Sequence, residues 1–303
     1  GSPAGGAPAA GFADGYASYG GPGLAIWGMP LYQNWNAHGL PAGGYDLDGW
    51  GWLAGGAVGA DWTFDSRLRL GAAFDFGAGN AEGGGDFNRT LNDMSFWGVN
   101  LYGGWKPGAF GVFADVGFSS GWNRFRQNLP PELQMADLEA GIASWALSTG
   151  LRAEYEFHTD IIDAIPHVGV RYSHLKTEQY SLKSAGLTVL EGDAICQNVW
   201  SLPIGVTFAR NFALGRGWAL RLSVDARITP NMGDVDARGG VSFTGVSGQT
   251  ELRTQVMDYV LFGGTAGAEL RKGERLRLGA HYDFEVGDHS DQHGVFATLT
   301  WRF

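Results

Sequence analysis

The sequence predicts an all-β protein: a 12-stranded antiparallel transmembrane β-barrel with short turns at one end and longer loops at the other. Three observations support this fold class. Apolar and polar residues alternate with a period of two, the alternating segments are long, and short and long connections follow one another in strict order along the chain.

The last ten residues, GVFATLTWRF, show the alternation in its simplest form. One series is mostly small or polar, and the other is apolar throughout, consisting of Val295, Ala297, Leu299, Trp301 and Phe303. Because successive side chains of a strand point to opposite faces, each series covers one face of the sheet. We expect the apolar face to contact lipid and Phe303 to lie at the periplasmic boundary of the membrane.

Similar alternation recurs upstream and predicts twelve strands. They are expected at about 23–36, 49–64, 67–79, 92–105, 109–125, 143–158, 163–178, 197–211, 217–229, 255–270, 275–287 and 292–303. Most of these segments have about 10–14 residues, whereas strands of soluble proteins most often have about 5–6 and tilted membrane strands about 9–11. The lengths therefore favour a membrane barrel.

The connections between these strands alternate between short and long. Turns rich in Gly, Pro, Asp and Ser occur at FDSR, KPG, HTDIID, LGRG and RKGE. Longer connections lie between them, at about 37–48, 80–91, 126–142, 179–196 and 230–254, with GDHSDQ as a shorter sixth. Short periplasmic turns and longer extracellular loops are the arrangement of outer-membrane barrels.

Aromatic residues gather near the short-turn ends, as expected of a girdle at a membrane interface. Examples are Trp62, Phe64, Trp105, Phe110, Tyr155, Phe157, Phe212, Trp218, Trp301 and Phe303. A soluble β-sandwich would also alternate, with its polar face in water. It does not explain the strand lengths, the order of the connections and the girdle together.

Composition excludes several other classes. Charged residues make up 17% of the chain, whereas a typical soluble domain has about 25%, and the chain contains 50 Gly. The net charge of −10 argues against a nucleic-acid partner. Cys196 is the only cysteine, so no intrachain disulfide or cysteine-based metal site can form. No apolar run reaches the roughly 18 residues of a membrane helix, and no cofactor or metal is expected.

The polar faces of the strands carry the candidate functional residues, which are charged and would line a hydrated lumen. They are Arg67, Arg69, Asp75, Asp115, Arg152, Glu154, Arg171, Arg221, Asp225, Arg227, Arg275, Arg277, Asp283 and Glu285. We expect opposite charges on adjacent strands to pair, joining Asp225, Asp283 and Glu285 to Arg221, Arg227, Arg275 and Arg277. Such a charge-balanced wall would offer an unfolded chain no apolar surface to which it could adhere.

Two stretches carry further signals of a known family. GGYDLDGWGWLAGGAVGADWTFDSRLRLGAAFDFGAGN combines a Tyr-Asp-x-x-Gly start, a Gly-rich strand, a Gly-x-Asp-Trp strand end and a Leu-x-Leu-Gly strand. FWGVNLYGGWKPGAFGVFADVGFSSGWNRF adds a Leu-Tyr-Gly-Gly-Trp approach to a tight turn. These motifs resemble consecutive strands of the autotransporter β-domain, and the resemblance extends from about residue 23 to residue 303. The carboxyl-terminal Val295, Leu299, Trp301 and Phe303 resemble the signal that the outer-membrane assembly machinery recognises.

The resemblance implies a translocator of type V secretion in the outer membrane of a Gram-negative bacterium. An upstream passenger would be exported to the cell surface, and the segment that joins it to the first strand would occupy the lumen. The expected partners are the lipid bilayer, the barrel-assembly machinery and the chain's own passenger. The barrel is expected to be monomeric, with its long loops extracellular and both barrel ends of the chain periplasmic.

The resemblance also divides the chain. Residues 1–22 would be a linker or passenger stub that begins with a probable cloning scar at Gly1 and Ser2, and residues 23–303 would form the barrel. Because the stub contains a Gly every few residues, an extended stub is as consistent with the sequence as the family's usual helix. Two shorter features are expected in the loops: helical turns from Pro131 and a hairpin within 230–256.

No catalytic role is expected, although two alternatives to a translocator remain open. Some autotransporters cleave their own linker through an Asn, but no Asn precedes residue 30. One alternative is a free-standing porin or channel. The other is an outer-membrane hydrolase that uses the His289, Ser290, Asp291 and His293 of the last loop, for which sequence proximity alone does not provide catalytic geometry.

Overall fold

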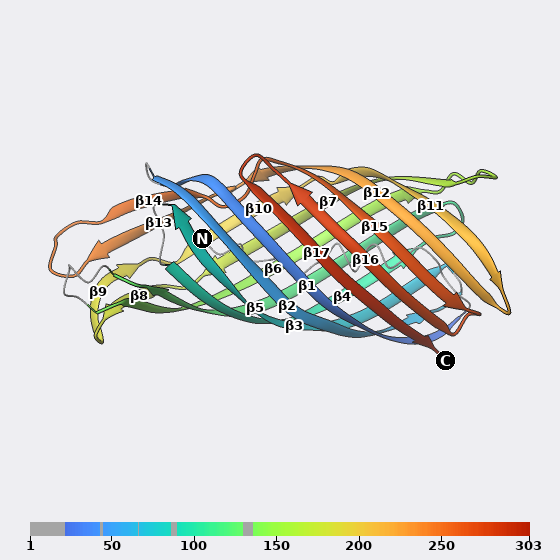
Figure 1. Ribbon diagram of the computed structural model, residues 1–303, viewed down its shortest axis with the longest axis horizontal. Coiled ribbons are helices and arrows are strands. Elements are labelled where there is room, and N and C mark those ends of the chain that lie inside the picture. The colour runs from blue at the N-terminus through green and yellow to red at the C-terminus, as the bar shows by residue number, and fades with distance from the viewer. Residues whose placement is uncertain (1–21, 43–44, 66, 86–89, 130–135) are drawn as a thin grey trace.

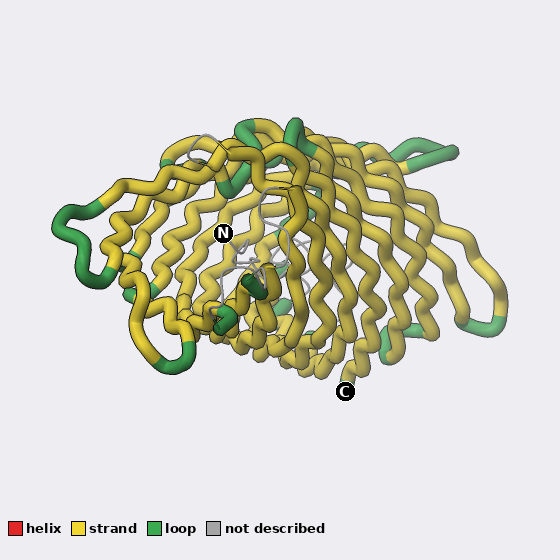
Figure 2. The backbone as a smooth tube through the Cα atoms, turned by 60° about the vertical axis from the view of Figure 1, so that its left-hand side comes forward, coloured by secondary structure: helices red, strands yellow, loops and turns green. Residues whose placement is uncertain are grey.

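The computed structural model describes residues 22–42, 45–65, 67–85, 90–129 and 136–303. In these residues the chain forms β-strands joined by turns and loops, and one sheet closes into a barrel (Figures 1 and 2). The all-β fold class is confirmed. The described part of the chain contains no helix that could cross a membrane.

Twelve strands form the described wall of the barrel, and the eighth of them is divided in two. They are β1 (Gly23–Ala42), β2 (Tyr45–Thr63), β3 (Leu68–Gly85), β4 (Thr90–Trp105), β5 (Phe110–Gln127), β6 (Leu138–Tyr155), β7 (Asp163–Thr177), β10 with β11 (Ile195–Ser201 and Ile204–Gly215), β12 (Trp218–Gly233), β15 (Val260–Lys272), β16 (Leu276–Val286) and β17 (Ser290–Arg302). The predicted number of strands is therefore confirmed.

Each wall strand pairs antiparallel with the next, and the last pairs with the first. The seam between β1 and β17 runs from Ala25 opposite Arg302 to Ala37 opposite Ser290. On its other side β1 pairs with β2 from Gly23 opposite Thr63 onward. Since both edges of β1 are paired, the barrel closes without an open strand edge along this seam, as a bilayer requires.

The strands extend further toward the long-loop end than the alternation predicts. The segment expected as a loop at 37–48 mostly continues β1 and β2, with Ala42 opposite Tyr45. Backbone pairing needs no apolar side chains, so a strand can continue where the hydrophobic pattern ends. The predicted helical turns from Pro131 fall largely outside the described residues.

Two further hairpins rise from the long-loop end, at the left of Figure 1. One consists of β8 (Tyr180–Ser184) and β9 (Leu187–Gly192), and the other of β13 (Asp236–Phe243) and β14 (Thr250–Gln255). The hairpins pair with each other through β9 and β13. The hairpin expected within 230–256 is therefore present.

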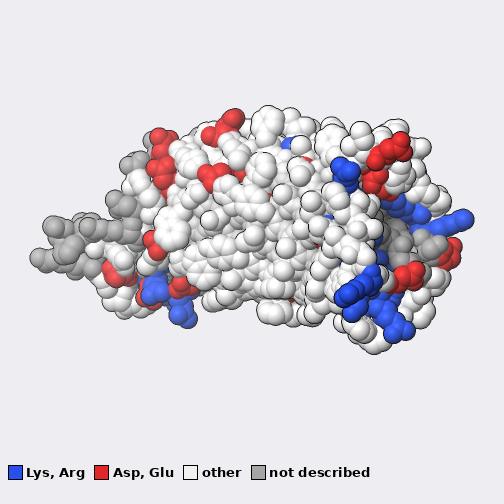
Figure 3. Space-filling model, turned by 45° about the vertical axis from the view of Figure 1, so that its right-hand side comes forward, with Lys and Arg blue, Asp and Glu red and all other residues white. Residues whose placement is uncertain are grey.

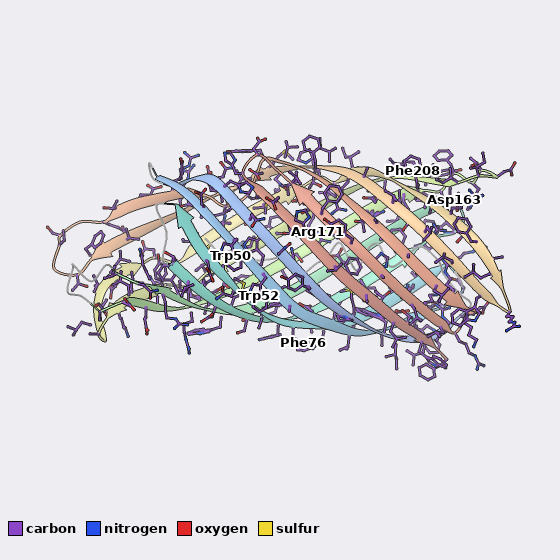
Figure 4. All side chains as sticks on the ribbon, in the orientation of Figure 1. Trp50, Trp52, Phe76, Asp163, Arg171 and Phe208 are labelled. Atoms are coloured by element: carbon purple, nitrogen blue, oxygen red, sulfur yellow. The ribbon has the colours of Figure 1, made fainter. Side chains whose placement is uncertain are left out.

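The outward faces of the wall strands are apolar. Leu101, Val224 and Phe262 are 65%, 57% and 60% exposed. Figure 3 shows a middle band almost free of charged residues, with Lys, Arg, Asp and Glu gathered at the two ends. In Figure 4, Phe76 and Phe208 lie at opposite edges of the barrel's outline, whereas Arg171 lies within it. This arrangement suits a surface that faces lipid.

A second row of aromatic side chains crosses the strands nearer the long-loop end, a feature that the sequence analysis did not identify. The rings of Trp97 and Phe118 are 5.9 Å apart, those of Phe118 and Trp145 are 6.3 Å apart, and Trp145 continues to His174 at 5.1 Å. With the row at the short-turn end, it brackets the apolar band as two interfacial girdles do.

Candidate functional site: the inner wall of the barrel

The inner wall is built from the side chains that alternate with the lipid-facing ones, and it divides into two parts. On β1–β5 many of these inward positions are apolar, whereas on β6–β16 they are mostly charged or polar. We call the two parts the apolar wall and the charged wall.

At the centre of the charged wall, two linked clusters join β7, β11, β12, β15 and β16. His167 Nε2 lies 2.7 Å from an Asp225 carboxylate oxygen, to which Thr207 also donates a hydrogen bond of 2.7 Å. Arg227 donates to Asp283 at 2.9 Å and to Glu285 at 3.1 Å, and its guanidinium is also 3.5 Å from Asp225. His167 reaches Asp225 over the intervening β11, and Arg227 reaches Asp283 and Glu285 over the intervening β15, so these opposite charges neutralise one another two strands apart.

A second pair bridges β5 and β7 over the intervening β6. Arg171 Nη2 donates to Asp115 Oδ1 at 2.8 Å. The pair passes over Gly150, where a Cβ would lie 2.7 Å from both side chains. A glycine at this position therefore allows two charged groups two strands apart to meet inside the barrel.

The short-turn end of the charged wall holds a third group of charges. Lys106 contacts Glu154 at 3.2 Å and Glu156 at 2.9 Å. Arg221 lies 3.9 Å from Glu156 and 3.7 Å from Asp163, whereas the sequence analysis expected it to pair with one of Asp225, Asp283 and Glu285. The reason is the register, since Arg221 faces Asn211 of β11 and Glu269 of β15.

Within this third group, Glu156, His158 and Asp163 bring three possible metal-binding atoms within 4.8 Å of one another. His158 Nδ1 is already 2.8 Å from Asp163. Lys106 and Arg221 also lie against the carboxylates. Because these cations compete with a metal ion for the same oxygens, the cluster fits an ion-pair network better than a metal site.

The apolar wall forms the main hydrophobic cluster of the described residues. Its buried members are Met29, Leu31, Leu53, Ala57, Ala73, Tyr102 and Phe113, and Trp27, Trp35, Met94, Phe96 and Phe296 pack against them. The expectation of a charge-lined inner wall is therefore wrong for this part, where the inward positions are apolar and packed against one another. The nearly continuous apolar run GLAIWGMPLY in β1 signals it, because a strand with only one face in lipid should alternate.

A small polar network lies within the apolar wall, near the short-turn end. Arg69 Nη2 donates to the buried Asp61 at 2.5 Å, and the Tyr102 hydroxyl donates to the same carboxylate oxygen at 3.3 Å. Trp27 Nε1 in turn donates to the Tyr102 hydroxyl at 2.7 Å. The apolar wall is thus anchored to a buried carboxylate.

The other charged residues singled out by the sequence occupy different environments. Asp75 is buried and accepts a 2.6 Å hydrogen bond from Asn100. Arg152 lies 3.7 Å from Glu154, and Arg277 is half-buried on β16. Arg67 and Arg275 are exposed in short turns and not on strands, because the alternation that placed them begins one residue outside β3 and β16.

The structure also shows the surroundings of the carboxyl-terminal residues and of the last loop. Val295, Leu299, Trp301 and Phe303 are exposed on the outward face of the end of the chain. Of the residues considered for a hydrolase, His289 and Ser290 both contact Asp258, whereas Asp291 contacts His38 at 2.8 Å and His293 at 3.6 Å, and His293 also contacts Tyr282. These contacts do not form a nucleophile–base–acid chain.

The autotransporter β-domain family model matches residues 26–283, which is most of the chain. The chain belongs to this family. It is therefore an outer-membrane translocator barrel that supports the export of an N-terminal passenger. No curated protein sequence is significantly similar to the chain.

Solved structures agree with this assignment at the level of the fold. The translocator domain of autotransporter NalP from Neisseria meningitidis has a TM-score of 0.74 and 14% identity, covering 97% of this chain and 93% of that one. The β-domain of the Bordetella autotransporter BrkA has a TM-score of 0.68 and 15% identity, covering 93% and 100%. The transport unit of AIDA-I from Escherichia coli gives 0.65 and 13%, covering 92% and 90%.

Proposed function

We propose that the passenger crosses the outer membrane through the interior of this barrel. The observation that carries the proposal is the closed β1–β17 seam, which separates an inner wall of paired charges from an apolar outer surface. A polypeptide backbone in transit needs hydrogen-bonding partners, and only the interior of such a barrel can supply them.

Buried polar atoms support a hydrated interior. Within the described residues, Asp61 Oδ1, Asp75 Oδ2 and Arg171 Nη1 are buried and have no hydrogen-bonding partner in the protein. Buried polar atoms are nearly always hydrogen-bonded to protein or to water. Water in the lumen would satisfy these three atoms and would also solvate the backbone of a passing chain.

We assign the short-turn end to the periplasm and the long-loop end to the cell exterior. The assignment rests on the usual arrangement of outer-membrane barrels and on the two hairpins, β8–β9 and β13–β14, at the long-loop end. With this orientation both barrel ends of the chain, Gly23 and Phe303, are periplasmic. Residues 1–22 would then link the passenger to a translocator of residues 23–303.

We further propose that the barrel is inserted by the barrel-assembly machinery and works as a monomer without catalytic activity. The outward Val295, Leu299, Trp301 and Phe303 would be the assembly signal. The apolar band surrounds the wall, so one copy is sufficient to satisfy the bilayer. The paired charges of the lumen would line the transport path.

The proposal is tested by fusing an epitope-tagged reporter, behind a signal peptide, to the N-terminal side of residue 1. Protease added to intact Gram-negative cells should remove the tag, and the exposure should disappear when residues 292–303 are deleted. A reporter that stays in the periplasm while the barrel folds, seen as heat-modifiable migration on a gel, would refute transport and favour a free-standing channel.

A further inference from the structure

The seam that closes the barrel changes partners near the long-loop end. β17 begins at Ser290, opposite Ala37 of β1. β1 itself continues to Ala42, whose partner on this side is Thr254 of β14. Between these two pairings, residues 38–41 have no ladder partner on this side, and the main-chain nitrogen of His38 bonds to His289 in the connection before β17. An unpaired stretch in a closing seam is a weak point, since ladder hydrogen bonds are missing there.

The carboxylate of Asp258 binds the hairpin that borders this gap. Asp258 is 1% exposed. It accepts hydrogen bonds from the main-chain nitrogen of His289 at 3.2 Å and from the hydroxyl of Ser290 at 2.6 Å, and it lies 3.0 Å from His289 Nδ1. A buried carboxylate without such donors is strongly unfavourable. The loop before β15 and the hairpin before β17 therefore hold each other in place.

The contacts continue on both sides of Asp258. Its main-chain oxygen accepts a 2.8 Å hydrogen bond from Asn231, whose own side chain accepts one of 2.7 Å from Ser201. On the other side, the main-chain nitrogen of His38 donates to the main-chain oxygen of His289 at 2.8 Å. One line of hydrogen bonds thus runs from β10 through β12 and the last hairpin to the end of β1.

The chain also leaves space for this carboxylate. A Cβ at Gly287 would overlap the Asp258 side chain. Ser290 and His289 contact the two different oxygens of the Asp258 carboxylate, and the serine hydroxyl donates to the carboxylate rather than to the imidazole. The three groups therefore do not form the relay of a serine hydrolase.

We propose that Asp258 is a positioning residue that clasps the last hairpin, residues 287–290, against the end of β1 and keeps the barrel closed at its mouth. Asp258, His289 and Ser290 form this rim clasp. It replaces strand pairing where the seam changes from β17 to β14. The proposal concerns closure and does not depend on what passes through the lumen.

The test compares Asp258→Asn with Asp288→Asn in the full chain, folded in detergent micelles. Asn has the size of Asp but lacks the charge and one acceptor, and Asp288 is an exposed neighbour. Hydrogen exchange is measured along the seam. Because charge-assisted hydrogen bonds are lost, amide exchange in 291–295 and 33–37 should accelerate about tenfold or more in Asp258→Asn. Exchange in 298–302 should stay unchanged in Asp258→Asn. In the control Asp288→Asn, exchange in 291–295 and 33–37 should also stay unchanged.

Gly287→Ala provides a second, independent perturbation, because it displaces the carboxylate without removing its charge. It should accelerate exchange in the same upper segments. If Asp258→Asn does not fold, Ser290→Ala, which removes one donor, should give a smaller acceleration at the same places. Unchanged exchange, or an equal acceleration along the whole seam, would overturn the proposal.

Discussion

An arginine placed in the lipid-facing band should destabilise the barrel far more than one placed on the inner wall. Leu101 of β4 is 65% exposed and lies midway between the outward Trp97 and Trp105. At about 3.3 Å per residue and a tilt of about 35–45°, these tryptophans are about 20 Å apart along the membrane normal. Leu101 therefore lies about 10 Å from each aromatic row, near the middle of the apolar band.

The size of the effect follows from this depth. An arginine at the midplane of a barrel's lipid face costs about 2–4 kcal/mol, which lowers the folding equilibrium constant about 30- to 700-fold. The matched control is Ser119→Arg, at an inward and half-buried position on the neighbouring β5. Because its guanidinium can reach the hydrated lumen, we expect a loss below about 1 kcal/mol.

The assay is reversible unfolding of both variants by urea in phospholipid vesicles, followed by heat-modifiable gel mobility. The expected result is a clearly lower unfolding free energy for Leu101→Arg and a nearly unchanged one for Ser119→Arg. Equal losses in the two variants, or a larger loss for Ser119→Arg, would show that the assignment of the two faces is wrong.

The inner wall gives two further predictions, both measured by the same unfolding assay. Arg227→Met leaves the acidic partners Asp283 and Glu285 without their cation and should lower the free energy of unfolding by about 1–3 kcal/mol. The control, Arg210→Met, removes an exposed cation–π contact and should lower it by less than about 1 kcal/mol. Similar losses in the two variants would contradict the role of the network. Gly59→Ala places a Cβ against the indole of Trp27 and should cost about 1–3 kcal/mol. The control, Gly28→Ala, whose Cβ would lie 4.0 Å from its nearest neighbour, should change stability by less than about 0.5 kcal/mol. A larger loss for Gly28→Ala than for Gly59→Ala would contradict the close packing of Trp27 on Gly59.

The lipid-facing half of the fold could be predicted from the sequence because a bilayer imposes a simple rule. Each outward side chain must be apolar, so a period of two is visible from Leu68 to Phe303 without knowledge of any contact. Short turns and long loops then fix the strand order. The ends of the strands were less predictable, since β1 continues to Ala42 through residues that have no hydrophobic pattern.

The inner wall was harder to predict, because its contacts depend on register and not on periodicity. Arg227 of β12 meets Asp283 and Glu285 of β16 over the intervening β15, where Gly263 leaves space, and not across adjacent strands as the sequence analysis expected. Arg171 and Asp115 likewise meet across an intervening strand, because Gly150 lies between them. Asp258 was not considered at all, since its donors come from a hairpin about thirty residues later.

The sequence analysis did not predict the apolar wall, for a different reason. The alternation was interpreted with one apolar and one polar face, which holds for β12 and β16 but not for β1. There Trp27, Met29 and Leu31 face inward while Ile26 and Tyr32 face outward. Near-continuous hydrophobicity in a strand of a barrel therefore indicates packing on both faces.

The most direct test of the central claim locates a passenger during transport. A photo-reactive residue replaces either Ser119, on the inner wall, or Leu101, on the lipid face, and export of a reporter is stalled by a disulfide-closed loop. The account predicts that the stalled reporter cross-links to position 119 and not to position 101. Cross-links at position 101 with none at position 119 would show that the passenger does not travel through the interior of this barrel.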